Sequence, residues 1–267
     1  MSIKQLCQAV VVDLQSVGAG NYILTLNEPL LSRNTRAGQF VEIKIPQCSV
    51  LWRRPFSVHD IHPEEQTIDI LFHAVGRGTE ALTHLRIGES VDLLGPLGNH
   101  FSYDGVTRAV AVAGGLGIAP FVLMMRELRA RKIPMTLLYG VGRAEQFCRT
   151  EELAVYAEVH LSTADGSHGR RGLVTELLED YLDQPNDLNG AMIYTCGPTA
   201  MLRRIQAIVE GRRLRAQASV ETVMACGFGA CVGCAVPMRH PLPGKKEYLL
   251  ACKDGPVFNI DEIILHD

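Results

Sequence analysis

The sequence predicts an α/β fold with a β-barrel, arranged in three parts. Up to about Leu94, polar and apolar residues alternate in short segments, which is typical of antiparallel strands. Strands and helices alternate after that, which favours a parallel sheet, and beyond about Arg213 neither pattern continues. We therefore expect an antiparallel barrel over 1–103, an α/β domain over 104–213 and a small cysteine-rich domain over 214–267.

The first part contains six candidate strands separated by Gly, Pro and Asn turns. Their sequences are QAVVVDL, YILTLN, FVEIKI, PFSVHDI, TIDILFHAV and SVDLL. Regularly spaced short strands with turns between them predict an antiparallel barrel of about six strands.

In the second part, segments with the hydrophobic period of a β-strand alternate with segments that have the period of an α-helix. Strand RAVAVAG precedes a helix over 120–131, and strands MTLLYG and EVHLST precede helix LVTELLEDYL. Strand AMIYT and helix AMLRRIQAIVEG complete the series. This alternation predicts a parallel sheet covered by helices on both faces.

Composition excludes several classes of protein. The 267 residues are 47% hydrophobic and 21% charged, with a net charge of −3, so no basic excess is available to bind nucleic acid. The N-terminus lacks the pattern of a secretory signal, and glycines and Pro120 interrupt the uncharged run over 109–125. We therefore expect a cytoplasmic protein that is not bound to a membrane.

Half of the eight cysteines lie in the last part of the chain. Three of them have the spacing C-x4-C-x2-C, and the fourth follows after 17 residues. This is the plant-type ferredoxin spacing for a [2Fe–2S] cluster. The predicted metal ligands are Cys226, Cys231, Cys234 and Cys252.

Glycines between these cysteines support the prediction. Gly227, Gly229 and Gly233 would let a tight loop direct backbone N–H groups at the cluster sulfurs. A structural zinc site is the alternative, but such sites usually use two C-x2-C pairs, and only one is present. Cysteines without a ligand are a further alternative.

Two segments of the barrel have side chains that suit a flavin dinucleotide. Arg54, Pro55, Phe56 and Ser57 would supply a cation for a pyrophosphate, an aromatic ring for the flavin and a hydroxyl for its polar edge. The segment over 76–79, which includes Gly78 and Thr79, opens a helix-like stretch whose N–H groups could bind the same phosphates. Each segment alone could equally be a strand end or a turn, but together they predict FAD.

Two loops at the carboxyl ends of predicted parallel strands suit a pyridine nucleotide, because open α/β sheets bind ligands at that edge. The first is a glycine turn before Pro120, although its spacing is not G-x-G-x-x-G. The second is a Cys-Gly-Pro loop, whose cysteine could lie beside a nicotinamide ring or could simply be buried. The predicted NAD contacts are Gly114, Gly115, Gly117, Cys196, Gly197 and Pro198.

These motifs, in this order, resemble the ferredoxin–NADP reductase superfamily over about 210 residues. Three further stretches are similar to the electron-transfer subunits of dihydroorotate dehydrogenase B and extend the resemblance to the whole chain. They are TADGS at 163–167, SVETVMAC at 219–226 and CKDGPVF at 252–258.

The resemblance implies FAD contacts at the two barrel segments and also at Leu71, Phe72 and His73. Many relatives have Tyr at the position of Phe56 and Arg at that of His73, so a hydroxyl and a permanent charge are missing here. The gap before Cys252 is also longer than usual, because of the segment HPLPGKKEY.

The resemblance further implies a role in pyrimidine biosynthesis. Dihydroorotate would be oxidised on a partner FMN subunit, within a two-plus-two heterotetramer, and its electrons would pass through [2Fe–2S] and FAD to NAD. No catalytic acid or base is expected in this chain. The alternative is a flavin and iron–sulfur subunit of an NADH-dependent ferredoxin:NADP oxidoreductase or of a sulfide dehydrogenase. Arg143 and Glu145 leave the choice between NAD and NADP open.

Overall fold

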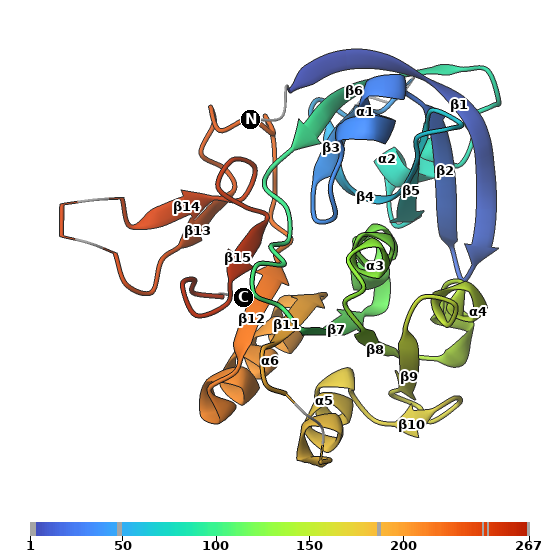
Figure 1. The fold of residues 1–267 in the computed structure, drawn as a ribbon. Helices are drawn as coiled ribbons and strands as arrows, with labels where there is room; N and C mark the ends of the chain where they lie inside the picture. The colour runs from blue at the N-terminus through green and yellow to red at the C-terminus, as the bar shows by residue number, and fades with distance from the viewer. Residues whose placement is uncertain (1–3, 47–49, 186–187, 242, 245, 266–267) are drawn as a thin grey trace.

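The computed structural model describes residues 4–46, 50–185, 188–241, 243–244 and 246–265. A barrel lies above a twisted sheet, and the C-terminal segment, orange to red in Figure 1, runs along one side of both. The predicted fold class is confirmed. None of the described helices is long and apolar enough to span a bilayer.

The N-terminal barrel has six strands, as predicted, and closes in the order β1-β2-β5-β4-β3-β6 with antiparallel pairing throughout. A short helix that the sequence analysis missed, α1 (Pro29–Asn34), buries Leu31 against the barrel core. A second, α2 (Arg77–Leu82), corresponds to the predicted helix-like stretch. The strands are β1 (Gln5–Gly18), β2 (Asn21–Asn27), β3 (Phe40–Lys44), β4 (Arg54–His62), β5 (Thr67–His73) and β6 (Ser90–Leu97).

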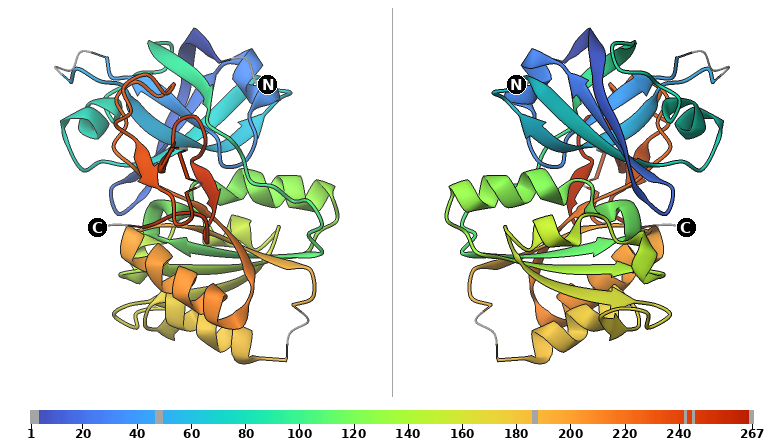
Figure 2. Two further views of the ribbon diagram at one scale, coloured as in Figure 1. Left: turned by 90° about the vertical axis from the view of Figure 1, so that its left-hand side faces the viewer. Right: turned by 90° about the vertical axis from the view of Figure 1, so that its right-hand side faces the viewer.

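The second layer is a seven-stranded sheet in the order β10-β9-β8-β7-β11-β12-β15, parallel except at β15. Helix α3 (Phe121–Ala130) lies between this sheet and the barrel, whereas α5 (Val174–Asp183) and α6 (Thr199–Arg212) cover the other face (Figure 2). A one-turn helix, α4 (Thr150–Leu153), follows β8. The strands are β7 (Arg108–Gly114), β8 (Met135–Val141), β9 (Glu158–Thr163), β10 (Arg170–Arg171), β11 (Ala191–Cys196), β12 (Arg215–Ser219) and β15 (Val257–Asn259).

The cysteine-rich segment leaves the sheet after β12 and returns to it at β15, which pairs with β12. Between them, β13 (Ala235–Pro237) and β14 (Tyr248–Leu250) form a hairpin, and the long HPLPGKKEY segment lies in its loop up to Tyr248, where β14 begins. Leu242 and Lys245 of that segment lie outside the described residues. The boundaries at 103/104 and 213/214 stay predictions, and both β12 and β15 lie beyond the second of them.

Asn99, just after the barrel, binds the C-terminal segment through its side-chain amide. Its Nδ2 donates to the carbonyl oxygens of Asp254 (2.9 Å) and Val257 (2.7 Å), and its Oδ1 accepts from the Val257 N–H (3.0 Å). We expect Asn99→Ala to lower the free energy of unfolding by about 2 kcal/mol, because both backbone groups of the buried Val257 lose a partner. In a thermal melt this corresponds to roughly 4–8 °C.

The control for Asn99 is Asn34→Ala, since Asn34 makes a single exposed hydrogen bond to the Leu30 carbonyl. Its melting temperature should stay close to that of the wild type. Equal melting temperatures for the two variants would contradict the assigned role of Asn99.

His59 joins the barrel to the sheet layer, because its Nδ1 donates to the Ala119 carbonyl at 2.8 Å. Burial lowers the pKa of His59 from 6.5 to about 4. Between pH 4 and pH 6.5 the unfolded chain therefore binds more protons than the folded chain. The stabilisation from a neutral His59 is complete above pH 6.5 and is lost as the pH falls towards 4, by about 3 kcal/mol.

We expect His59→Asn to flatten this dependence, because an asparagine amide can donate the same hydrogen bond without titrating. The free energy of unfolding, measured by urea titration from pH 4 to 7, should fall less steeply than in the wild type. The exposed His84→Asn is the matched control and should retain the wild-type slope. Identical slopes for all three proteins would refute the assignment.

Candidate functional site

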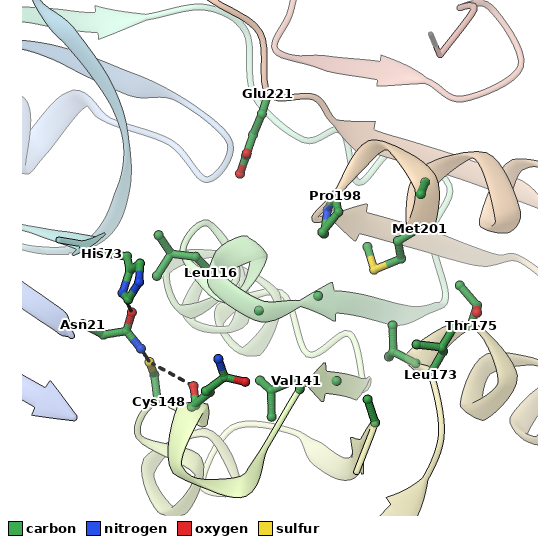
Figure 3. Close-up of a pocket in the computed structure, with 18 of the residues that line it drawn as sticks. Asn21, His73, Leu116, Val141, Cys148, Leu173, Thr175, Pro198, Met201 and Glu221 are labelled. Carbon is green, nitrogen blue, oxygen red and sulfur yellow. Dashed lines mark hydrogen bonds between the residues drawn. The ribbon is translucent and has the colours of Figure 1, made fainter. Parts of the chain in front are cut away.

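A cavity of about 1060 Å³ lies between the barrel and the carboxyl ends of strands β7, β8 and β11. Figure 3 shows its walls, with His73 on the barrel side, Leu116 and Val141 at the sheet edge, and Pro198 at the start of α6. This is the edge at which open α/β sheets bind ligands. Its volume exceeds that of most single-ligand pockets, which suits two ring systems in one space.

Aromatic rings from the barrel form one wall. Tyr22 and Phe72 stack with ring centroids 5.6 Å apart, and Phe56 meets Phe72 edge-on at 6.1 Å. Phe56 and Phe72 line the cavity together with Pro55. The wall is therefore apolar. Its half-buried Phe56 ring could lie against a flavin, and the Phe72 ring supports it from the barrel core.

A chain of hydrogen bonds crosses from this wall to the sheet layer (Figure 3). The Asn21 carbonyl oxygen accepts from His73 Nδ1 at 3.0 Å, and the Asn21 amide donates to Cys148 Sγ at 3.3 Å. With the amide in this orientation, neutral His73 carries its proton on Nδ1, and its Nε2 is left as an acceptor. Neither Asn21 nor Cys148 belongs to a recognisable motif, so the sequence does not indicate a site role for either residue.

Arg54 and α2 lie next to each other at the edge of the barrel. A Cβ atom at Gly78 would lie 3.9 Å from Arg54 Cγ and Nε, so the guanidinium group and the start of α2 can face one ligand. The Thr79 hydroxyl accepts from the N–H groups of Val75 (3.0 Å) and Gly76 (3.3 Å) and shapes the preceding turn. Thr79 also lines the cavity.

The glycine turn and the Cys-Gly-Pro loop pack tightly against each other on the sheet side. A Cβ atom at Gly117 would lie 2.1 Å from the Cys196 carbonyl oxygen, so only glycine fits there. At Gly115, by contrast, φ is +55° and a Cβ atom would meet nothing within 4 Å. The turn therefore leaves open space above Gly115, inside the cavity.

The structure brings about half of the predicted FAD and NAD contacts into this cavity. Those that line it are Pro55, Phe56, Phe72, His73, Thr79, Gly114, Gly115 and Pro198. Those that do not are Arg54, Ser57, Leu71, Gly78, Gly117, Cys196 and Gly197. Cys196 is 4% exposed and burial raises its pKa, so its thiol is covered. The individual binding roles stay predictions.

The four tail cysteines form two pairs. The Cys231 N–H donates to Cys226 Sγ at 3.4 Å, whereas the sulfurs of Cys234 and Cys252 lie 3.2 Å apart and are buried. Within the described ranges, no group of three or more His, Cys, Asp or Glu side chains is arranged to bind one metal ion. Two pairs of thiols fit a group with two irons, which takes four cysteine ligands.

The loop around Cys226 favours a thiolate. Partial burial opposes ionisation, but the N–H groups of Cys231, Phe228 and Ala230 point at its sulfur and lower the Cys226 pKa to about 6. Gly227 has a φ of +71°, which permits this tight turn. Backbone donors around a ligating sulfur also suit an iron–sulfur cluster.

The cluster loop rests directly on the barrel. A Cβ atom at Gly227 would lie 2.6 Å from the carboxyl carbon of Glu42 in β3. The Gly227 backbone and the Glu42 carboxyl group are therefore in contact. Glu42 is opposite Pro55 in the pairing of β3 with β4. The thiol loop therefore lies one strand away from the predicted flavin segment. Burial, and secondly the nearby Cys226, raise the pKa of Glu42 to about 7.

Two family models match the chain. Residues 221–264 match the iron–sulfur cluster binding domain of dihydroorotate dehydrogenase B, and residues 111–207 match the oxidoreductase NAD-binding domain. The predictions of an iron–sulfur domain in the tail and of a nucleotide-binding domain before it are confirmed.

Solved structures share the fold. The structure of an NADH-dependent reduced ferredoxin–NADP oxidoreductase matches with a TM-score of 0.85 and 24% identity, covering 96% of this chain and 90% of that chain. An Amycolatopsis cytochrome P450 reductase matches with a TM-score of 0.68, covering 81% of this chain and 70% of that chain. Both therefore support the architecture of barrel and nucleotide-binding sheet.

Curated relatives cover almost the whole chain. The electron transfer subunit of dihydroorotate dehydrogenase B (NAD(+)) from Bacillus cereus strain B4264 is 33% identical over 260 residues, which are 96% of this chain and 97% of the relative. The subunit of the same name from Bacillus anthracis strain CDC 684 gives the same values. Together with the barrel, the nucleotide-binding sheet and the paired tail cysteines, this similarity shows that the chain belongs to the family of dihydroorotate dehydrogenase B electron transfer subunits and is an oxidoreductase component.

Proposed function

We propose that this chain transfers electrons from dihydroorotate, oxidised on a partner FMN subunit, to NAD, and that it binds FAD and a [2Fe–2S] cluster for this purpose. The observation that carries the proposal is the placement of three sites. The aromatic barrel wall and the glycine turn share one cavity, and the cysteine loop rests on the strand beside that wall. Electron carriers in these sites would be neighbours.

The two cofactors supply complementary chemistry, since a flavin exchanges hydride or single electrons whereas an iron–sulfur cluster exchanges single electrons only. The residues of this chain bind and orient them. Phe56, backed by Phe72 in the barrel core, offers an apolar surface to the flavin, and His73, fixed by Asn21, offers Nε2 as a hydrogen-bond acceptor. Arg54 and the turn before Thr79 are placed to bind its phosphates.

The nucleotide would enter on the sheet side of the same cavity. The open space above Gly115 admits the backbone of a ligand, and Pro198 borders the crevice between β7 and β11. A nicotinamide ring in this crevice would face the barrel wall, so the two reacting rings could meet with water excluded between them.

The cluster would be held by Cys226, Cys231, Cys234 and Cys252. The first two lie nearer the surface and the last two are buried, so the ligand set would reach from the protein exterior into the hydrophobic core. Four thiolate ligands need a reducing environment, which supports a cytoplasmic location as part of the proposal.

Exposed apolar side chains around the cysteine loop support a partner subunit. Val223 is 86% exposed, Phe228 53% and Val232 42%, and all three lie close in sequence to the exposed Cys231. Apolar side chains gathered on a surface mark sites of protein association. We propose that the FMN subunit binds here, in a two-plus-two heterotetramer.

The test is reconstitution of the complete reaction. The purified chain, loaded with FAD and iron, should co-purify with a candidate FMN subunit, and the complex should reduce NAD when dihydroorotate is added under anaerobic conditions. The FMN subunit alone should oxidise dihydroorotate with an artificial acceptor but should not reduce NAD. Reduction of NADP⁺ by NADH together with reduced ferredoxin, without any response to dihydroorotate, would instead assign the chain to an NADH-dependent ferredoxin:NADP oxidoreductase.

A further inference from the structure

A buried carboxyl group lies between the barrel and the cysteine-rich segment. Glu42 stands in β3 between Val41 and Ile43, which belong to the barrel core. Because successive side chains of a strand point to opposite faces, the Glu42 side chain points out of the barrel. Phe40, on the same face, packs into the hydrophobic cluster that contains Cys252. The C-terminal segment, orange and red in Figure 2, therefore covers this face, and Glu42 is 0% exposed.

The Glu42 carboxyl group has no hydrogen-bond partner among the residues that the structure describes, although both of its oxygens are buried. It lies against the backbone of Gly227, where a Cβ atom would be 2.8 Å from Oε1 and 2.9 Å from Oε2. A buried carboxyl group without a hydrogen bond costs stability. Its presence beside the cysteine loop therefore points to a role other than packing.

The charged groups around Glu42 do not neutralise it. Arg53 forms an ion pair with Asp92 at 2.9 Å, and Arg54 donates to backbone carbonyl oxygens of its own segment. Burial, and secondly the nearby Cys226, raise the pKa of Glu42 to about 7, and the two arginines oppose this shift without cancelling it. A negative charge on Glu42 and a negative charge at Cys226 therefore repel each other.

Reduction adds one negative charge to an iron–sulfur cluster, and nearby charges help to set its reduction potential. We propose that Glu42 lowers the reduction potential of the cluster, because its carboxylate repels the added electron where water is excluded. A lower potential favours transfer of that electron to FAD. One electron reaches the cluster and one leaves it, and Glu42 is neither oxidised nor reduced. This inference rests on the proposed function, in which the cluster passes electrons to FAD.

The experiment measures the reduction potential of the cluster in the full chain loaded with FAD and iron. Electron paramagnetic resonance follows the reduced cluster during an anaerobic redox titration at pH 9, where a carboxyl group with a pKa of about 7 is ionised. In Glu42→Gln we expect the equilibrium constant for cluster reduction to rise about tenfold, a positive shift of about 59 mV for a one-electron couple. Glu42→Asp keeps the charge and should retain most of the wild-type potential.

Urea unfolding separates this role from packing. Glu42→Gln keeps the shape of the side chain and removes a buried charge, so the free energy of unfolding should not fall. Glu65→Gln, which removes an exposed carboxylate from the turn after β4, is the matched control and should leave the potential unchanged. An unchanged potential in Glu42→Gln, with or without a loss of stability, or an equal shift in Glu65→Gln, would overturn the inference. If the wild-type chain binds no iron, the proposed function itself fails, which is a separate result.

Discussion

Cys231→Ser is expected to abolish dihydroorotate-dependent NAD reduction by the complex with the FMN subunit, by roughly 100-fold or more. A serine hydroxyl is a poor ligand for iron, and Cys231 is the exposed member of its pair, so the substitution disturbs no packed side chain. Iron and acid-labile sulfide should fall towards zero, and the electron paramagnetic resonance signal of the reduced cluster should disappear.

The same variant should keep activities that need only the flavin. Oxidation of NADH with a two-electron dye should stay within about twofold of the wild type, because Cys231 does not line the cavity. Cys7→Ser, in β1 of the barrel, is the control and should retain iron and full activity. Full NAD reduction by an iron-free Cys231→Ser protein would falsify the proposed electron route.

Gly117→Ala is expected to have the largest effect of any substitution in the nucleotide half. The new Cβ atom would lie 2.1 Å from the carbonyl oxygen and 2.5 Å from the carbonyl carbon of Cys196, and both belong to the backbone. The glycine turn would have to move away from the Cys-Gly-Pro loop, at a cost of about 3 kcal/mol in the free energy of unfolding. NAD⁺ binding should weaken at least about tenfold, because the crevice between the two loops is displaced.

Urea unfolding and an NAD⁺ titration measure both effects. Gly211→Ala is the control, since a Cβ atom at that position in α6 would meet nothing within 4 Å. Alanine is the better helix former, so this variant should gain about 0.5–1 kcal/mol of stability. If Gly117→Ala proves as stable as Gly211→Ala, the two loops do not pack as described.

The fold was largely predictable, because the hydrophobic periodicity that marks each strand and helix lies within a short stretch of sequence. Polar and apolar residues alternate along each barrel strand, and apolar residues recur on one face of each helix in the sheet layer. Neither signal depends on a partner that is distant in the sequence. The exceptions are short. Helix α1 begins at Pro29 with Glu28 as its cap, and β15 has only three residues, so it becomes a strand only by pairing with β12.

The part of the candidate site whose residues all stand in one sequence motif could be predicted. The four cysteines predicted as ligands follow a fixed spacing, and the structure brings them together in two pairs. The nicotinamide contact was harder to assign, because a loop sequence does not show which side of the loop faces the ligand. Cys196 turned out to be covered, and Glu221, which stands in a motif that resembles the family, lines the cavity in its place.

The sequence by itself thus determined the architecture, the family and the presence of an iron–sulfur domain in the tail, because periodicity and cysteine spacing are properties of neighbouring residues. Only the tertiary structure decided which side chains share the cavity. Asn21 meets Cys148 across 127 positions, and the thiol loop meets Glu42 of the barrel. Such contacts depend on how the barrel, the sheet and the returning tail pack together, and no local pattern in the chain encodes that packing.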